Sequence, residues 1–290
     1  MSVLRQTILP ARVVIVDDGS TDRSLRRVEE IVKTGVSLGV DCDVVSKSNG
    51  GASSARNVGV ARLNTKYVAF LDADDEWDEH FLEKMCSLIQ DFPNSVLYCL
   101  GHRVIVDDSE SIDRDSGKMA TRGKVENFFK SSISSSVANS SKVCVCKAAL
   151  HKIGGFPEGV LLGEDLYVWI RLAMEGDVVS DSYVGAMVYR QASHRIRIKS
   201  RNLYSPFPLE YFRKRRSEIA NYKWLATYLK IVGLKHFLPS VLEGDFRSAT
   251  RRWAALWNIF PLFAVALLPS FLFIPIGYAF DKSRRISRQE

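Results

Sequence analysis

Three acidic side chains that follow a short apolar run are the residues of this sequence best suited to chemistry. The run is Tyr67–Leu71, and Asp72, Asp74 and Asp75 come directly after it. A short, uniformly apolar run is typical of a strand buried on both faces, and ligands on sheets of such strands bind beyond the carboxyl ends. We therefore expect the three carboxylates at a ligand-binding edge of a sheet.

Carboxylates in such a cluster repel one another unless a cation or the donors of a ligand offset their charge. Mg²⁺ takes oxygen ligands and often shares one or two carboxylates with substrate phosphates. The spacing of Asp72 and Asp74 therefore indicates an Asp-x-Asp metal–diphosphate site. The alternative is an acidic turn in which an aspartate caps a helix that begins near Asp78.

The composition is that of a globular protein with a basic second part. Of 290 residues, 46% are hydrophobic and 25% are charged, which argues against disorder, and the net charge is +7. Arginine and lysine concentrate after Arg190, which suits anionic partners such as a nucleotide-sugar, nucleic acid or an anionic membrane surface. The five scattered cysteines predict no disulfide framework, and Cys144 and Cys146 are expected as core thiols rather than as a zinc pair.

Strands and helices alternate along the first part of the chain. The predicted strands are Val13–Val16, Cys42–Ser46, Tyr67–Leu71, Ser95–Leu100 and Arg103–Val106. Amphipathic or small-residue segments separate the first four strands. This alternation predicts a parallel α/β sheet.

Further polar residues stand where they could meet the acidic cluster. Asp17 and Asp18 follow the first strand, and Asn49-Gly50-Gly51 opens a small-residue helix, unless it is a simple turn. Arg56 on that helix is expected to reach back toward the strand ends. Glu164 and Asp165 start a later helix, either as acids that face the helix dipole or as a functional pair. The polar stretches 107–123 and 131–141, the second rich in serine, predict lids or binding loops.

In this order the segments resemble the family 2 glycosyltransferases of the GT-A fold. The matching segments are Val14–Asp22, Asn49–Gly59, Phe70–Trp77, Gly154–Phe156 and Gly163–Leu172. The resemblance implies an α/β fold with a mixed, Rossmann-like sheet flanked by helices, as in nucleotide-diphospho-sugar transferases. It also implies an inverting enzyme that moves a sugar from a nucleotide donor, usually a UDP-sugar, to an acceptor hydroxyl.

The resemblance also implies a role for each matching residue. Asp17, Asp18, Arg56 and Asp72 would bind the nucleotide-sugar. Asp74 would hold a divalent metal, Mg²⁺ or Mn²⁺. Asp165 would be the catalytic base, with Glu164 beside it in the same motif.

The chain departs from the family pattern at its beginning. Members normally start with a strand and then a helix, whereas Ser2–Thr7 resembles only the end of that helix. The resemblance therefore implies that the first strand and most of the first helix are absent, which would expose the neighbouring strand. We expect a shortened form of a longer product, the alternative being a fragment with impaired activity.

The sequence predicts a transferase domain at 1–200 and a helical extension at 201–290. An uncharged run at 259–280 has about the length that spans a bilayer, but Pro261, Pro269 and Pro275 interrupt it. Basic residues on both sides favour a re-entrant or interfacial segment, and a buried helical pair is the alternative. This predicts contact with a membrane surface. Because family members often carry such tails, the resemblance implies the cytoplasmic face of the membrane and a saccharide or lipid-linked saccharide acceptor in cell-envelope polysaccharide synthesis.

The leading hypothesis is therefore a metal-dependent, membrane-associated glycosyltransferase that binds no nucleic acid. A second hypothesis is a catalytically impaired remnant that binds nucleotide or serves as a scaffold. A nucleotidyltransferase that uses the same acids is disfavoured, because the sequence has no glycine- and lysine-rich pyrophosphorylase loop.

Overall fold

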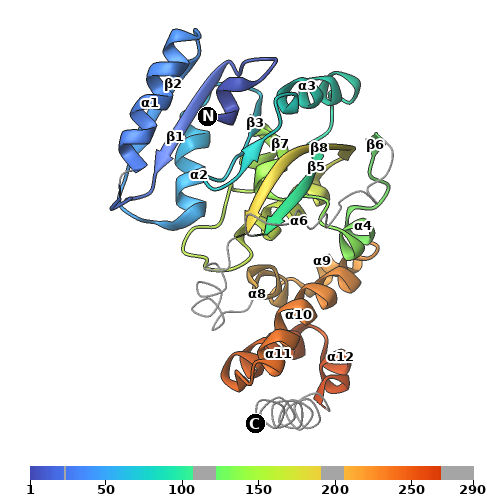
Figure 1. The fold of residues 1–290 in the computed structure, drawn as a ribbon. Helices are drawn as coiled ribbons and strands as arrows, with labels where there is room; N and C mark the ends of the chain where they lie inside the picture. Colours follow the sequence, from blue (N-terminus) through green and yellow to red (C-terminus); the bar gives the residue numbers. More distant parts are fainter. Residues whose placement is uncertain (23, 107–121, 191–205, 269–290) are drawn as a thin grey trace, which may run out of the picture. The chain divides into compact units, whose positions relative to one another are not determined.

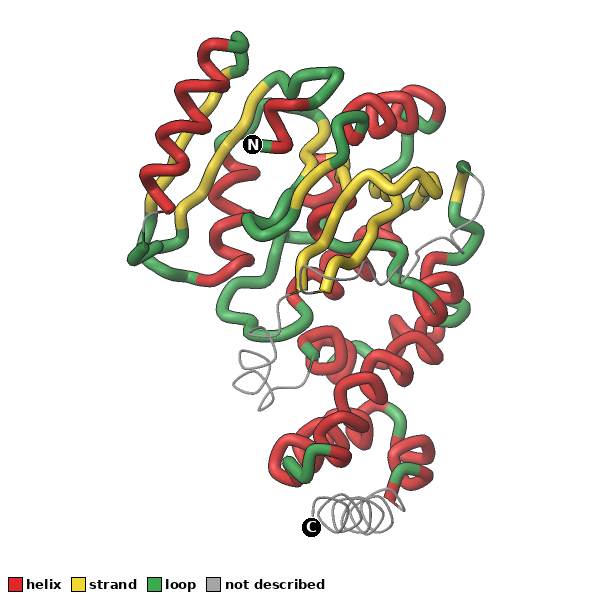
Figure 2. Tube along the Cα trace, viewed as in Figure 1, coloured by secondary structure: helices red, strands yellow, loops and turns green. Residues whose placement is uncertain are grey.

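The computed structural model describes residues 1–22, 24–106, 122–190 and 206–268, and the chain forms two compact units. The N-terminal unit comprises Met1–Val160 and Glu164–His194, and the C-terminal unit comprises Leu161–Gly163 and Arg195–Glu290 (Figure 1). The domain boundary predicted at residue 200 lies outside the described residues. The N-terminal unit contains all the strands, and the described part of the C-terminal unit is helical (Figure 2).

The first two strands form a small sheet with helices packed against it. β1 (Arg12–Asp17) pairs in parallel with β2 (Asp41–Ser46), in the register Arg12↔Asp41 to Asp17↔Ser46. α1 (Ser24–Ser37) connects them, and α2 (Gly51–Ala61) follows β2. A Cβ on Gly59 of α2 would lie 3.4 Å from Val16 of β1, so the small residues bring this helix close to the strand as the sequence predicts.

The remaining strands form a second, mixed sheet in the order β3-β7-β5-β8-β4, with β6 paired to β8. These strands are β3 (Tyr67–Ala69), β4 (Glu76–Trp77), β5 (Leu97–Val106), β6 (Gly123–Lys124), β7 (Val143–Cys146) and β8 (Val178–Arg190). β5 and β8 are parallel, whereas β7 runs antiparallel to both β3 and β5. Among the described residues, β3 pairs only with β7, and β1 only with β2.

The mixed sheet agrees with the GT-A resemblance and corrects the parallel sheet predicted from the alternation. The alternation of strands and helices ends at β5, which is one strand where the sequence predicted two. The described chain then passes through β6 and two short helices to β7, which enters the sheet antiparallel to β5. A parallel strand after β5 would need a crossover connection. The strand–helix alternation of the first 106 residues does not specify the connection that follows them.

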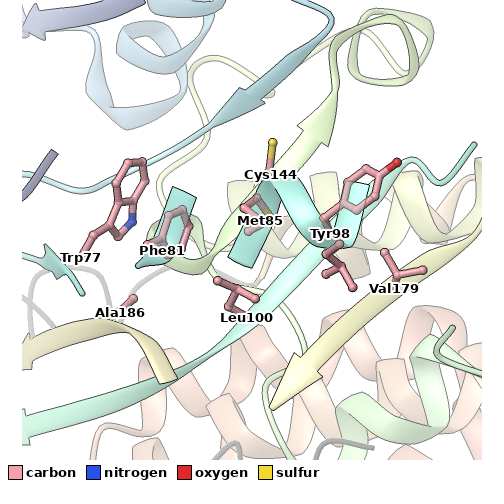
Figure 3. Close-up of a cluster of buried hydrophobic side chains, with 9 residues drawn as sticks. Trp77, Phe81, Met85, Tyr98, Leu100, Cys144, Val179 and Ala186 are labelled. Carbon is pink, nitrogen blue, oxygen red and sulfur yellow. The ribbon is translucent and has the colours of Figure 1, made fainter. Parts of the chain in front are cut away.

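The core of the N-terminal unit lies between β5 and α3 (Phe81–Asp91), whose apolar stripe is buried as predicted. Figure 3 shows the cluster, in which the rings of Trp77 and Phe81 stack with centroids 4.1 Å apart. Tyr98 and Leu100 of β5 belong to this cluster, and Leu97 and Cys99, which alternate with them, are equally buried. Since side chains alternate along a strand, β5 is covered on both faces.

The serine-rich stretch 131–141, predicted as a lid or binding loop, is a loop only at 135–139, between two short helices of the N-terminal unit. α4 (Phe128–Ser134) begins at Asn127, whose side chain accepts a hydrogen bond from the N–H of Lys130 at 2.9 Å. The short 3-10 helix η2 (Ser140–Lys142) leads directly into β7, and all three of its residues are buried. Most of the other predicted loop, residues 107–121, lies outside the described residues.

All five cysteines are free thiols; of the two that were expected as core thiols, Cys144 is buried, whereas Cys146 is only partly buried. The N-terminal 3-10 helix η1 (Ser2–Arg5) buries Leu4 and Ser2, and the Ser2 hydroxyl accepts a hydrogen bond from the N–H of Trp77 at 3.2 Å. Two short helices complete the description of this unit, α5 (Lys147–Lys152) and α6 (Glu164–Glu175).

The C-terminal unit contains α8 (Phe207–Arg213), α9 (Arg216–Ala220), α10 (Leu225–Leu242), α11 (Phe246–Ile259) and α12 (Pro261–Ala266). α10 and α11 pack around Phe237, Val241 and Ala249. A tight turn joins them: Gly244 has φ +73°, and Asp245 accepts a hydrogen bond from the N–H of Ser248 at 3.1 Å.

None of the helices in the described part of the chain is both long and apolar enough to cross a membrane. The apolar run predicted at 259–280 is described only as far as residue 268, and its remainder lies outside the described residues. In the part that is described, the run is split between the end of α11 and α12, with Pro261 as the first residue of the new helix.

Candidate functional site

The carboxyl end of β1 carries the first pair of predicted site residues, in a tight turn. Asp17 is buried and accepts a hydrogen bond from the N–H of Ser20 at 3.2 Å. Gly19 has φ +79°, and a Cβ there would lie 2.9 Å from the backbone nitrogen of Asn49. Only glycine fits both the left-handed backbone and this approach, so the turn brings the segment before α2 against the end of β1.

The Asp18 carboxylate holds the segment before α2 in place. Its carboxylate accepts hydrogen bonds from the Lys47 ammonium at 2.5 Å, from the N–H of Gly50 at 2.9 Å and from the N–H of Gly51 at 2.7 Å. Burial opposes ionisation here, but these donors outweigh it and hold the pKa of Asp18 below its usual range. The two amides belong to the start of α2, where an anion is favoured by the helix dipole. Asp18 therefore fixes the helix that carries Arg56.

Arg56 connects three parts of the sequence that are far apart in the chain. Its Nη2 lies 2.7 Å from Oδ1 of Asp72, and its Nη1 lies 3.7 Å from Oε1 of Glu164. Its guanidinium also lies over the ring of Phe156, 5.3 Å from the centroid. Burial lowers the pKa of Arg56, but Asp72, Asp165 and Glu164 together raise it above its usual value. The sequence-predicted arginine and acids are thus brought together.

Asn57, the neighbour of Arg56, joins α2 to the glycine turn that precedes α6. Its amide nitrogen donates to the carbonyl of Phe156 at 2.8 Å and to Glu158 at 3.0 Å, and its amide oxygen accepts from the N–H of Phe156 at 2.9 Å. Gly155 has φ +73°, and a Cβ there would lie 2.9 Å from that oxygen. Two motifs that the sequence shows separately are therefore one hydrogen-bonded unit.

The acidic turn after β3 is closed by a hydrogen bond from the N–H of Asp75 to the carbonyl of Asp72 at 3.1 Å. The Asp72 carboxylate contacts Arg56, and the Asp74 side chain is exposed. The Asp75 carboxylate accepts hydrogen bonds from the hydroxyl of Ser141 and from the N–H of Tyr189. α3 begins only at Phe81, so the contacts of Asp72 and Asp75 are not those of a helix cap.

The pKa of Asp75 is raised to about 6, first because burial penalises the charged form and then because Asp74 and Asp72 lie near. The hydrogen bonds from Ser141 and Tyr189 act in the opposite direction. The Asp75 carboxyl group therefore takes up a proton more readily than an ordinary aspartate does.

Asp165 and Glu164 stand in the first turn of α6. The pKa of Asp165 is raised to about 6 by burial and by the Glu164 carboxylate, against the attraction of Arg56. Its Oδ1 accepts a hydrogen bond from the N–H of Leu166 at 2.7 Å. Glu164 pairs with Arg56, which a carboxylate that only faced the helix dipole would not do. A half-buried acid with a raised pKa beside an arginine is suited to accept a proton near neutral pH.

The donor set fits a hard divalent cation that brings other ligands with it. No group of three or more histidine, cysteine, aspartate or glutamate side chains in the described ranges could hold a metal ion by itself. Mg²⁺ is commonly bound through one or two carboxylates, with waters and substrate phosphates as the other ligands. The exposed side chain of Asp74 could supply such a carboxylate ligand.

Three kinds of comparison with known proteins bear on this site. The family model described as Glycosyl transferase family 2 matches residues 1–152. An uncharacterized glycosyltransferase of Nostoc, alr2836, is 34% identical over 116 residues, which are 40% of this chain and 34% of that protein. The putative teichuronic acid biosynthesis glycosyltransferase TuaG of Bacillus subtilis is 32% identical over 113 residues, 39% of this chain and 43% of TuaG.

The solved structure of S. aureus TarS 1-349, a complex with UDP-GlcNAc, has a TM-score of 0.67 and 19% identity to this chain. The match covers 97% of this chain and 86% of that one. At this identity the likeness concerns the fold, a GT-A-like mixed sheet flanked by helices. The chain matches about a third or less of the length of the first curated relatives, such as alr2836 at 34% and EpsJ of Bacillus subtilis at 20%.

Proposed function

Because the chain belongs to glycosyl transferase family 2, we propose that it transfers a sugar from a nucleotide-sugar, a UDP-sugar, to an acceptor hydroxyl with inversion at the anomeric carbon. One observation carries this proposal: Arg56 meets the Asp-x-Asp turn through Asp72 and the start of α6 through Glu164. A donor site and a base are needed at the same place, and these contacts join the candidates for both. The UDP-GlcNAc complex of TarS, which shares the fold, supports the donor class.

Asp17, Asp18, Arg56 and Asp72 bind the nucleotide-sugar in this proposal. Arg56 has a hydrogen-bond donor to offer, because its buried Nη1 makes no hydrogen bond among the described residues, although Glu164 lies 3.7 Å away. An unfulfilled guanidinium donor favours an anionic acceptor such as a diphosphate oxygen. Part of the contribution of Asp18 is to hold the start of α2 in place, because its carboxylate already accepts three hydrogen bonds.

Asp74 holds the divalent cation, Mg²⁺ or Mn²⁺, together with the diphosphate of the donor. The cation supplies charge neutralisation on the leaving diphosphate when it is bound. Arg56 contributes to the same neutralisation from α2. Asp72 orients Arg56 through their 2.7 Å contact, so that one aspartate of the turn serves the arginine and the other the metal.

Asp165 is the base, and Glu164 supports it by pairing with Arg56. The Asp165 carboxylate takes the proton of the acceptor hydroxyl while that oxygen forms a bond to the anomeric carbon. The bond from that carbon to the diphosphate breaks, and its electron pair leaves with the nucleoside diphosphate. A single displacement of this kind inverts the configuration. A pKa of about 6 leaves Asp165 mainly ionised at neutral pH, and a stronger base than an ordinary aspartate.

The acceptor in this proposal is a saccharide or a lipid-linked saccharide of a cell-envelope polysaccharide, the class to which the name of TuaG points. We place the reaction at the cytoplasmic face of a membrane, with the C-terminal unit in contact with its surface. Leu262 is 87% exposed, and Trp257 and Val265 are exposed nearby. Residues 206–268 contain ten lysines and arginines against four acids, a balance that favours an anionic surface.

The test is donor binding and transfer by the purified protein. UDP-GlcNAc and other UDP-sugars are titrated calorimetrically with Mn²⁺, Mg²⁺ or chelator, and release of UDP is followed with saccharide acceptors. We expect metal-dependent binding, transfer, and loss of both in the Asp74→Ala variant. Absence of binding to any UDP-sugar with metal would overturn the proposal. For the membrane contact, co-sedimentation with anionic vesicles but not with neutral ones is expected.

The second candidate is a protein that binds the nucleotide-sugar but transfers poorly. It is favoured by one observation, the separation of β1 and β2 from the main sheet among the described residues. Asp17 and Asp18 lie at the end of β1, so the donor site depends on two sheets that share no pairing there. Binding without UDP release in the same experiment would select this candidate.

A further inference from the structure

The acidic turn converges on Ser141, a residue that the sequence shows only as one of several serines. The Ser141 hydroxyl accepts a hydrogen bond from the N–H of Asp72 at 3.2 Å and donates one to the carboxylate of Asp75. Its carbonyl oxygen accepts a hydrogen bond from the indole Nε1 of Trp77 at 2.7 Å. One residue of η2 therefore holds the first and last residues of the turn and the aromatic side chain that follows it.

The strand pairing explains why a side chain, rather than a strand carbonyl, accepts the hydrogen bond from the N–H of Asp72. β3 and β7 pair as far as Ala69↔Cys144, and the N–H of Phe70 still lies 3.4 Å from the carbonyl of Val143. Beyond that point the two chains diverge, and the Ser141 hydroxyl, rather than a strand carbonyl, accepts from the N–H of Asp72. Ser141 is 1% exposed, so water does not readily replace this bond.

The other side of the turn is held by β8. The N–H of Tyr189 donates to Oδ1 of Asp75 at 3.1 Å, while Ser141 occupies Oδ2. Asp75 is thereby fixed between η2 and β8, while the Asp72 carboxylate contacts Arg56 and Asp74 is exposed. The directions of these two carboxylates depend on the anchoring of the turn that bears them.

We propose that Ser141 is a positioning residue for the diphosphate–metal site: through the amide of Asp72 and the carboxylate of Asp75 it sets the direction in which Asp72 and Asp74 present their carboxylates. The proposal rests on the proposed function for the identity of the ligand. Its structural part, that Ser141 holds the turn, stands on the three hydrogen bonds of Ser141 alone.

The first test compares Ser141→Ala with Ser141→Thr, which keeps the hydroxyl, and with Ser132→Ala. Ser132 is a matched control, because it is also buried and its hydroxyl makes no hydrogen bond among the described residues. Loss of a group that orients metal-binding residues commonly weakens metal affinity by about 10-fold or more. We expect Ser141→Ala to raise the half-saturating Mn²⁺ concentration and the KM for the UDP-sugar by that factor, with kcat within about threefold of wild type.

The second test measures hydrogen exchange of residues 70–78 without donor or metal, and so does not depend on the proposed function. Ser141→Ala should speed exchange there about 10-fold or more relative to both wild type and Ser132→Ala, as local opening becomes easier. Unchanged exchange would overturn the proposal. So would faster exchange with unaltered Mn²⁺ and donor constants, or equal changes in Ser132→Ala. If the wild-type protein binds no UDP-sugar, the proposed function fails, and exchange alone decides whether Ser141 holds the turn.

Discussion

Two arginines with little exposed side chain, one in each unit, are stabilised by different kinds of partner. Arg56 in the N-terminal unit meets carboxylates, with Asp72 at 2.7 Å and Glu164 at 3.7 Å. Those charges raise its pKa against the effect of burial. An arginine in such surroundings stays charged, but the carboxylates it meets are themselves at a sheet edge and a helix start, where ligands bind.

Arg252 of α11, in the C-terminal unit, is 4% exposed and meets neutral acceptors. Its Nη1 donates to the carbonyl of His236 and to the hydroxyl of Ser240. Burial lowers the pKa of Arg252, and the more distant Asp245 and Glu243 oppose that shift. Burial and then Arg252 lower the pKa of His236 to about 4, so this histidine is neutral at pH 7.

This difference in partners distinguishes Arg56, an arginine of a candidate site, from Arg252, an arginine of a helical core. Neutral carbonyls and hydroxyls satisfy donors and hold α10 to α11, and they bring no charge that a ligand could exploit. A group of titratable residues with perturbed pKa values, as around Arg56, is instead the arrangement typical of functional sites. Activity should therefore depend on the first arginine and stability on the second.

The largest effect is expected at the base. Asp165→Asn keeps the shape of the side chain and removes its ability to accept a proton, so transfer should fall by about 10³-fold or more. Donor affinity, measured by calorimetry with Mn²⁺, should stay within about twofold of wild type, because the base acts on the acceptor. Loss of donor binding in this variant would contradict the assignment of Asp165 as base.

Truncation of the two arginines tests the comparison directly. Arg56→Ala should lower kcat/KM by about 10²-fold, because it removes one partner of buried charge pairs and a cation beside the diphosphate. Arg252→Ala should leave kcat/KM near wild type below the melting transition and lower the free energy of unfolding by about 1–3 kcal/mol, because buried acceptors lose their donor.

Thermal unfolding and steady-state kinetics on both variants provide the measurement. If Arg252→Ala lost activity without losing stability, or if Arg56→Ala were only less stable, the two arginines would not differ in role as expected. Arg56→Lys separates the effect of charge from that of geometry, because lysine keeps the charge but cannot contact Asp72 and Glu164 with a planar pair of donors. We expect activity between those of wild type and Arg56→Ala.

The pKa of Asp165, about 6 in the folded protein, sets an expected pH dependence. Below that pH the base is protonated, so kcat/KM should fall by about tenfold per pH unit, and it should level off above pH 7. The folded protein binds this proton more tightly than an ordinary aspartate does in the unfolded chain. Stability should therefore rise, relative to Asp165→Asn, as the pH falls from 7 toward 4. Urea unfolding of the wild type and of Asp165→Asn at several pH values measures this difference in stability.

Local patterns predicted the parts of the fold that depend on neighbours in the chain. The acids at the ends of β1 and β3 and the buried stripe of α3 follow from strand and helix periodicity. Gly35 lies within α1, which continues to Ser37. A Cβ on Gly35 would lie 2.4 Å from Sγ of Cys42, so its reason is packing against β2. Sequence alone does not show such a contact.

The candidate site shows the same limit. The resemblance to the family assigned Arg56, Asp72 and Asp165 their roles, and the structure brings all three into one electrostatic cluster. It could not reveal Ser141, which lies 66 residues from the Asp75 that it bonds. Contacts of that kind depend on the antiparallel entry of β7, which the strand–helix alternation predicted wrongly.

The smallest effect is expected at Asn57, which touches neither the proposed donor nor the base. Asn57→Ala removes both hydrogen bonds to Phe156 and so loosens the ring over which the Arg56 guanidinium lies. Arg56 keeps its carboxylate partners, so kcat/KM should fall only about threefold to tenfold, as expected for a residue that acts through another. Glu158→Gln is the matched control, because it keeps an acceptor for Asn57 at the same place. If Asn57→Ala matched Arg56→Ala in kinetics, the position of Arg56 would depend on the glycine turn more than on the carboxylates, and the contrast with Arg252 would need a packing explanation instead of an electrostatic one.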